Sequence, residues 1–469
     1  MTRGIPRGGV RAAVLMPLLV VLLAGCGGAA DPPAAATSNT RPNVVFILID
    51  TLRADRVHAV RHGRPVMPFL SGMARESAWY PNAISPSSWT KPALASIITG
   101  VYPYAHGIVY SARLEDPERP TSDRLAESWT TLAERFTSAG YTTWAFQTNA
   151  NLAPALGFAQ GYEAGHYHFH NGAPAEAVTS AAIAALPSLD PPFFLYAHYM
   201  DPHAPYRPDP AVAGALGPMP DLPAYDQALI DDDARFMAYY LDQVQTAIGL
   251  QPAHTIPDLS EAGKEAVRHR YDLECLAADR AVETLVRGIR AVEPNTVFVV
   301  LSDHGEEFWE RGGMGHGVTL HQEQIRVPLI IDAPFAGPAE HAERVSVLTV
   351  LQDLWGRLGV ASRESPGGAA LSFTRGPWAS LGVDQRAIVH EGAVWIEDSA
   401  GGRHWLFDLD ADPGELDDRS GADPDRAERL RSLLEESQPR SPAGVVEGAA
   451  LSESDLEALD AVGYLGGRD

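Results

Sequence analysis

Cysteine and positive charge are both scarce in this sequence of 469 residues. Its two cysteines, Cys26 and Cys275, stand in unlike contexts and are too few for a disulfide framework. Lys and Arg total 36 against 60 Asp and Glu, which gives a formal charge of −24. Because nucleic-acid binding needs a surplus of basic residues to neutralise phosphates, we expect no nucleic-acid partner.

The first apolar run is too short to cross a bilayer. Three arginines precede an uncharged stretch over residues 12–25, whereas a membrane span needs ~20 residues. This order is typical of a secretory signal, and Leu23-Ala24-Gly25-Cys26 resembles a bacterial lipobox. We therefore expect a lipoprotein signal peptide over 1–25 and lipidation of Cys26. The alternative is a plain signal peptide with an incidental cysteine.

Residues 26–40 are poor in large apolar side chains and rich in Gly, Ala, Pro, Ser and Thr. Such a composition cannot build a core, so we predict a flexible tether. A diacylated N-terminus would hold the protein stably at a membrane surface. The predicted location is the cell envelope, outside the cytoplasm, on the periplasmic or surface face of a bacterial membrane.

The remaining sequence alternates short apolar runs with helical patterns. Residues 44–49 form an unbroken apolar run rich in β-branched side chains, which suits a strand buried on both faces of a parallel sheet. The same pattern recurs at 193–197, 297–301 and 327–331, and helical spacing appears at 125–139 and 278–289. We predict an α/β fold with a mostly parallel central sheet.

Two stretches depart from this alternation. Residues 394–396 and 405–409, followed by a helical pattern at 426–436, predict a small antiparallel unit with a helix near the C-terminus. Residues 208–260 are rich in proline and acidic residues, which indicates an insertion, with a lid as one interpretation. Cys275 falls in a helical stretch and is most simply a small buried hydrophobic residue.

Polar residues follow three of the apolar runs directly. Asp50 follows the first, residues 198–203 the second, and Asp303 with His304 the third. Ligands bind outside the carboxyl ends of strands in such sheets, and carboxylates with imidazole hold Zn²⁺, Mn²⁺, Mg²⁺ or Ca²⁺. A lone Asp in this place is more often a helix cap, and Asp-His-Gly can be a simple turn. Their joint placement favours a metal site.

Residues 87–100 predict a loop that enters a helix, with proline early and glycine at the end. A helix N-terminus offers N–H groups and positive potential to an anion. Thr90 lies at this point, and from local sequence alone it is most simply an N-cap. The neighbouring Trp89 is a candidate either for stacking on a sugar or aryl group or for ordinary packing.

Several ordered motifs resemble the sulfatase family, which belongs to the alkaline-phosphatase-like superfamily. The resemblance covers residues 41–466 and implies a three-layer α/β/α sandwich with a small C-terminal α+β subdomain. It predicts a catalytic domain over 41–375 and a C-terminal subdomain with a tail over 376–469. The motifs are Asp50-Thr51-Leu52-Arg53-Ala54-Asp55, residues 90–107, residues 198–206, Ser302-Asp303-His304-Gly305-Glu306-Glu307, Gly315-His316-Gly317, Asp412-Pro413-Gly414-Glu415 and residues 459–465.

The sequence departs from the family at the nucleophile. Sulfatases place a Cys or Ser, oxidised to formylglycine, two residues before a proline and an Arg two residues after it. Thr90 and Leu94 occupy these positions, so the formylglycine route is closed. Thr51 replaces a second Asp. The resemblance then implies one divalent metal held by Asp50, Thr90, Asp303 and His304, as in Thr-nucleophile phosphotransferases, with Zn or Mn favoured over Ca or Mg.

The resemblance also assigns residues around the ester. His203 matches a histidine that contacts the ester oxygens, and His316 lies where related hydrolases carry a Lys or His toward the same group. An exposed loop histidine is the alternative for His316. For His203 the alternatives are a loop residue or, together with Asp201, a ligand of a second metal.

Two further substrate-binding candidates come from the segments around these motifs. Lys91 would neutralise the ester anion in place of the missing Arg, or else lie solvated at the helix start. Asn149 would hydrogen-bond the substrate. The sequence therefore predicts a metal-dependent ester hydrolase that acts through a covalent Thr90 intermediate on a sulfated or phosphorylated small molecule or glycan.

Two other functions stay open at this point. One is a phosphoethanolamine- or glycerophosphate-type transferase, although such enzymes normally carry transmembrane helices before the catalytic domain. The other is a non-catalytic, glycan-binding lipoprotein with a degenerate site, because Ala93 and Leu94 stand where the family has polar residues.

The predicted lipidation of Cys26 allows a direct test of localisation. Wild-type protein should sediment with membranes, and Cys26→Ser should move it to the soluble fraction because no acyl chain can be attached. Fractionation followed by immunoblotting measures this. Unchanged sedimentation of the variant would contradict lipidation at Cys26, and Cys275→Ser serves as the control that should leave the distribution unaltered.

Overall fold

The computed structural model describes residues 41–111, 121–252, 256–362, 368–376, 382–437 and 447–461. The predicted signal peptide, the tether and Cys26 lie outside these ranges. Among the described helices, none has both the length and the apolar character needed to cross a membrane.

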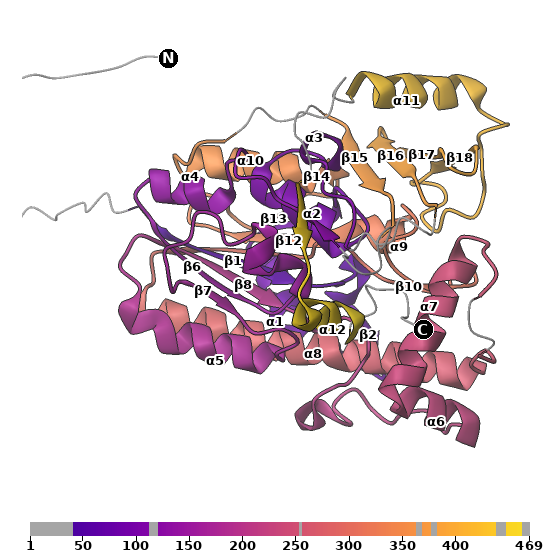
Figure 1. Ribbon diagram of the computed structural model, residues 1–469, viewed down its shortest axis with the longest axis horizontal. Coiled ribbons are helices and arrows are strands. Elements are labelled where there is room, and N and C mark those ends of the chain that lie inside the picture. The colour runs from indigo at the N-terminus through magenta and orange to yellow at the C-terminus, as the bar shows by residue number, and fades with distance from the viewer. Residues whose placement is uncertain are drawn as a thin grey trace, which may run out of the picture. The chain divides into compact units, whose positions relative to one another are not determined.

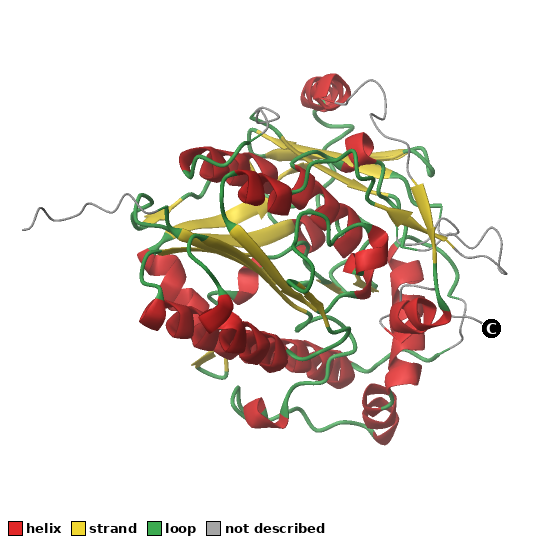
Figure 2. Ribbon diagram, turned by 60° about the vertical axis from the view of Figure 1, so that its left-hand side comes forward, coloured by secondary structure: helices red, strands yellow, loops and turns green. Residues whose placement is uncertain are grey.

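Nine strands of the described chain form the central sheet (Figure 2). Five of them run parallel to one another, in the order β9 (Thr296–Leu301), β1 (Asn43–Ile49), β8 (Phe193–Tyr199), β6 (Thr142–Gln147) and β7 (Tyr167–Phe169). Beyond β9, β12 (Arg326–Asp332) is antiparallel to its neighbours β9 and β4 (Ala78–Ile84). The short strands β13 (Ala339–Glu340) and β14 (Val345–Ser346) pair with β4. The predicted mostly parallel sheet is confirmed.

Both faces of the sheet are covered by helices, and β1 shows why. Val45, Ile47 and Ile49 enter one hydrophobic core, whereas the alternate residues Val44, Phe46 and Leu48 enter the other. On the first face lie α1 (Pro68–Glu76), α5 (Ala175–Ala185) and α8 (Glu261–Val292); on the second lie α2 (Thr90–Thr99), α4 (Leu132–Ser138) and α10 (Val347–Arg357) (Figure 1). This is the predicted α/β/α sandwich.

Two predicted helices differ in length from the observed ones. The helix expected from residue 125 begins only at Leu132, because Thr131 and Glu134 form a capping box that fixes the start. The helix expected at 278–289 is the last part of α8, which has 32 residues. Cys275 lies on α8 and is fully buried, as predicted.

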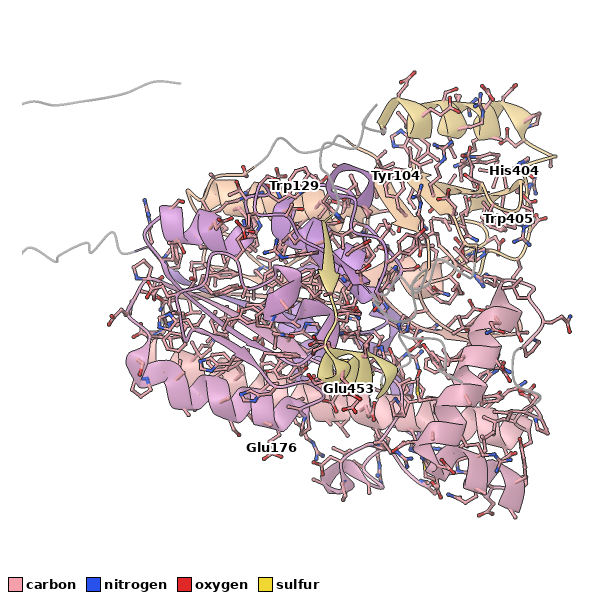
Figure 3. The ribbon with its side chains drawn as sticks, viewed as in Figure 1. Tyr104, Trp129, Glu176, His404, Trp405 and Glu453 are labelled. Carbon is pink, nitrogen blue, oxygen red and sulfur yellow. The ribbon has the colours of Figure 1, made fainter. Side chains whose placement is uncertain are left out.

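The predicted C-terminal antiparallel unit is a four-stranded sheet. Its strands are β15 (Ala370–Thr374), β16 (Gln385–His390), β17 (Ala393–Asp398) and β18 (Arg403–Asp408), and α11 (Pro424–Ser437) packs on it. His404 and Trp405 on β18 are labelled in Figure 3. Because β15 pairs with β16, the sheet begins at Ala370, ahead of the boundary predicted between 375 and 376.

The proline-rich insertion is packed against the body. It contains α6 (Ala224–Asp231) and α7 (Asp233–Ala247), and α7 contacts β11 (Met314–Gly315), which pairs with β10 (Glu307–Phe308). A Cβ atom at Gly313 would lie 2.5 Å from the Gln243 carbonyl oxygen, and one at Gly315 would lie 2.5 Å from Val244 Cγ2. Glycine is therefore required for this close approach.

The remaining elements are short. The last described segment contains β19 (Glu447–Ala450), which pairs with β5 (Thr121–Arg124), and α12 (Glu453–Ala461). The others are β2 (Val60–Arg61), β3 (Arg64–Pro65), α3 (Pro103–His106), α9 (Gln322–Ile325) and five 3₁₀ turns, at Ala54–Arg56, Ala150–Leu152, Pro154–Leu156, Leu186–Ser188 and Pro210–Val212.

Candidate active site

The carboxyl ends of three adjacent strands bring four polar side chains together. Because β9, β1 and β8 are neighbours in the sheet, Asp50, His198, Asp303 and His304 meet at one edge. All four are fully buried. One ligand atom each from Asp50, Asp303 and His304 lies within 4.8 Å of the others. The sequence predicted this triad; it did not assign His198 to the site.

Asp50 is held by a set of hydrogen bonds. Its Oδ2 accepts from Asn149 Nδ2 at 2.8 Å and lies 3.0 Å from His198 Nε2. His198 is fixed in turn through its Nδ1, 2.9 Å from the Tyr196 hydroxyl. Burial opposes ionisation of Asp50, but the His198 hydrogen bond and the nearby histidines together bring its pKa below the ordinary value. Asp50 is thus a carboxylate, with Oδ1 directed toward His304.

Asp303 has an unsatisfied oxygen beside this carboxylate. Its Oδ1 accepts from the backbone N–H of His304 at 3.0 Å and of Thr51 at 3.4 Å, whereas the buried Oδ2 accepts no hydrogen bond. Burial and the negative charge of Asp50 raise the pKa of Asp303 well above its usual range. A cation between two buried carboxylates removes this penalty, so the residues present fit a divalent metal.

Thr90 completes the cluster from the opposite side. It is the first residue of α2, and its Oγ1 lies 3.2 Å from His304 Nε2 and 3.5 Å from Asp50 Oδ1. The N-cap position is occupied by Trp89 instead, so the local interpretation of Thr90 as an N-cap is wrong. The positive end of the α2 dipole faces the place where an anion bound to Thr90 would lie.

Two further histidines, His316 and His203, lie beside the cluster, with His316 between His304 and His203. The ring centre of His316 is 4.4 Å from that of His304 and 5.0 Å from that of His203. Burial lowers the pKa of His304 to about 3 and that of His316 to about 4, so both imidazoles are neutral at pH 7. His203 donates from Nδ1 to the Ala204 carbonyl at 2.6 Å, which leaves its Nε2 as the basic nitrogen.

His316 is oriented by a buried network that the sequence did not reveal. Its Nδ1 lies 2.9 Å from the Tyr240 hydroxyl and 3.0 Å from Glu306 Oε1. Tyr206 donates to the other Glu306 oxygen at 3.0 Å. Tyr240 comes from α7 in the insertion, where no motif marks it. Glu306 lies in the Asp303-His304 motif, but the sequence did not predict a role for it.

The remaining predicted substrate residues lie in other settings. Asn149 contacts Asp50, as described. Lys91 is fully buried, which excludes the solvated alternative; its Nζ donates to the Tyr110 carbonyl at 3.3 Å and contacts Ser122 Oγ. Trp89 is fully buried against α12, so it packs and is not a stacking surface for a sugar.

The comparisons with known proteins show the family of the chain. The model of the Sulfatase family matches residues 42–360. A Δ4,5-hexuronate-2-O-sulfatase of Bacteroides thetaiotaomicron is 22% identical over 374 residues, which cover 75% of this chain and 74% of that protein.

Two solved structures share the fold. A 2-O GAG sulfatase superposes with a TM-score of 0.66 at 17% identity, covering 87% of this chain and 95% of the other. The phosphonate monoester hydrolase of Agrobacterium radiobacter superposes with a TM-score of 0.65 at 17% identity, covering 88% of this chain and 100% of the other. The chain belongs to the sulfatase family and is an ester hydrolase of that family.

The metal cluster can be tested by elemental analysis. Asp303→Asn should lower metal affinity by more than the ~10–100-fold expected for loss of an outer partner, because it would replace a charged oxygen ligand with a neutral amide. Asp279→Asn is the matched control, since Asp279 is equally buried but accepts only from the backbone N–H groups of Phe69 and Leu70. Full metal content in Asp303→Asn would rule this carboxylate out as a ligand.

The network around His316 makes a second prediction. Tyr240→Phe should lower kcat on an aryl ester about 10-fold, because one buried hydrogen bond that orients His316 is worth ~1.5 kcal/mol. The neighbouring Tyr239→Phe is the control, since its hydroxyl donates to Asp258 away from the histidines. Equal kcat in the two variants would show that Tyr240 does not act through His316.

Proposed function

We propose that this protein hydrolyses sulfate or phosphate esters through a covalent intermediate on Thr90. The observation that carries the proposal is the position of Thr90 Oγ1, within 3.5 Å of both Asp50 Oδ1 and His304 Nε2 at the start of α2. A threonine hydroxyl is a weak nucleophile, so it needs activation of the kind that such surroundings supply.

Asp50, Asp303, His304 and Thr90 would hold one divalent metal, which supplies positive charge that lowers the pKa of the Thr90 hydroxyl and stabilises the charge developing on the transferred group. Two carboxylates with an imidazole suit a borderline cation, which favours Zn or Mn over Ca or Mg. A second metal stays an alternative and would bring in Asp201, His203 or His316; Asp201 Oδ2 accepts from the Ala175 N–H at 2.8 Å.

The reaction would proceed in two displacements. In the first, the Thr90 hydroxyl loses its proton, Oγ1 forms a bond to sulfur or phosphorus, the ester bond breaks, and the alcohol oxygen gains a proton. His203 and His316 lie beside the cluster; a neutral imidazole there would take the Thr90 proton, pass it to the leaving alcohol oxygen, and contact the ester oxygens. In the second, water attacks the sulfur or phosphorus and gives up a proton, the bond to Thr90 Oγ1 breaks, Oγ1 regains a proton, and the free sulfate or phosphate leaves.

Thr90 differs from formylglycine in how the intermediate is resolved. A formylglycine hydrate expels sulfate by collapsing to an aldehyde, whereas Thr90 has no second hydroxyl. Water must therefore attack the transferred group itself, as phosphoryl enzymes do. This difference supports phosphate esters, or mixed specificity, beside the sulfate esters that the family relationship supports.

The substrate we propose is a sulfated or phosphorylated sugar. The printed activities of the relatives support it: one acts on a Δ4,5-hexuronate 2-O-sulfate and one is a 2-O GAG sulfatase. The similarity to a phosphonate monoester hydrolase supports a phosphorylated substrate as the alternative to a sulfated one. Ala93 and Leu94, which motivated a non-catalytic function, are buried in the fold, and Leu94 belongs to the core beneath α2.

We further propose that the enzyme works at a membrane surface outside the cytoplasm. This proposal rests on the lipobox-like sequence that ends at Cys26 and on the tether that follows it. Such an anchor would keep the catalytic domain next to the envelope while the substrate arrives from outside.

The nucleophile is tested with matched aryl sulfate, phosphate monoester and phosphate diester. Thr90→Ala should lower kcat on the order of 10³-fold or more, and Thr90→Ser should keep part of it. Thr99→Ala, on the same helix and equally buried, is the control. Wild-type turnover by Thr90→Ala would exclude covalent catalysis at Thr90. A sulfated or phosphorylated Thr90 peptide in mass spectrometry would support the covalent intermediate.

A further inference from the structure

The last described segment, residues 447–461, contacts the catalytic part of the fold; we call it the C-terminal strap. Its strand β19 pairs with β5 in a two-stranded sheet, and its helix α12 follows after two residues. Figure 1 shows both in yellow, well apart from α11 and the C-terminal sheet, and Figure 3 labels Glu453 at the start of α12.

The helix of the strap packs on the residue before the nucleophile. Leu456 and Leu459 form one hydrophobic cluster with Trp89 and Ala150, and Trp89 is completely buried by it. Trp89 is the N-cap of α2 and directly precedes Thr90. Ala150 directly follows Asn149, whose amide holds Asp50. One apolar contact therefore reaches the two backbone segments that carry Thr90 and Asn149.

The strand of the strap reaches the residue after the nucleophile. Ala449 lies opposite Ser122 in the β19–β5 ladder, and Ser122 Oγ contacts Lys91 Nζ. The next residue of β5, Asp123, accepts from the backbone N–H of Tyr110 at 2.8 Å. Within the described residues, β5 pairs with no strand other than β19. Ser122 Oγ also donates to the Ser111 carbonyl at 2.5 Å, so the strap is one of two segments that hold Ser122.

The start of α12 is fixed locally. The Asp455 N–H donates to Ser452 Oγ at 3.2 Å, and the Ser452 N–H donates to Asp455 Oδ2 at 2.9 Å, a reciprocal cap. A helix of nine residues is marginal alone, so its contact with Trp89 is what holds it. Leu451, between β19 and α12, packs against the same cluster.

We propose that the C-terminal strap positions the nucleophile of this enzyme. It fixes Trp89 on one side of Thr90 and Lys91, through Ser122, on the other, and so sets the distance of Thr90 Oγ1 from Asp50 and His304. Leu459 and Ser122 are positioning residues in this arrangement: Leu459 acts through Trp89 and Ser122 through Lys91. The proposal rests on the function proposed for Thr90. A displacement of about 1 Å at a reacting atom costs up to ~10²-fold in rate, so loosening the strap should affect chemistry more than binding.

The experiment compares Leu459→Ala and Ser122→Ala with Leu434→Ala in the full-length protein, with 4-nitrophenyl sulfate and 4-nitrophenyl phosphate as substrates. Leu434 is the matched control, because it is equally buried but lies on α11. We expect kcat to fall about 10- to 100-fold in the first two variants, with KM and metal content unchanged. Leu459→Met should restore most of kcat, since it refills the space beside Trp89.

The outcomes separate this proposal from the one on which it rests. If a folded Leu459→Ala or Ser122→Ala keeps the wild-type kcat while Thr90→Ala is inactive, the strap does not position the nucleophile. A loss of kcat in Leu434→Ala equal to that in Leu459→Ala would assign the effect to stability and would also overturn the proposal. If Leu459→Ala does not fold, the smaller change Leu459→Val decides, because it removes only one methylene group beside Trp89. Wild-type turnover by Thr90→Ala would instead refute the function proposed for Thr90.

Discussion

Two carboxylates without access to water, Asp50 and Asp303, are the constraint around which the rest of this structure is arranged. Like charges in a buried site repel each other, and each loses its hydration, so the pair is unfavourable unless positive charge and hydrogen bonds compensate. The protein supplies His198 and Asn149 to one carboxylate and backbone N–H groups to the other. The compensation is incomplete by one oxygen, Asp303 Oδ2, and a cation at this place would complete it.

Much of the fold and the centre of the site followed from local patterns. Runs of buried β-branched residues mark parallel strands, and the polar residue after each run falls at a shared edge, so Asp50, Asp303 and His304 were predictable from sequence. The start of α4 was not, since one capping box outweighs apolar spacing that begins seven residues earlier. Nor was the pairing that draws Ala370–Thr374 into the C-terminal sheet.

The parts of the site that escaped prediction come from tertiary packing. Tyr240 lies on a helix with no distinguishing pattern, and only the docking of that helix brings its hydroxyl to His316. Lys91 has the sequence context of a solvated side chain, but the chain folds back over it and buries its ammonium group. Side chains that act through another residue leave no periodic trace in a sequence, because their position depends on elements far away along the chain.

The glycines opposite α7 carry a consequence for how this enzyme can be changed. At Gly313 and Gly315 the backbone of one segment passes so close to the helix that any side chain would collide with it. Helix α7 and the turn that contains Gly313 and Gly315 therefore fit each other closely, and neither can change without the other. If the insertion were transferred to a related protein, the turn with Gly313 and Gly315 would have to be transferred with it. Without these glycines α7 could not pack closely enough for Tyr240 to reach His316.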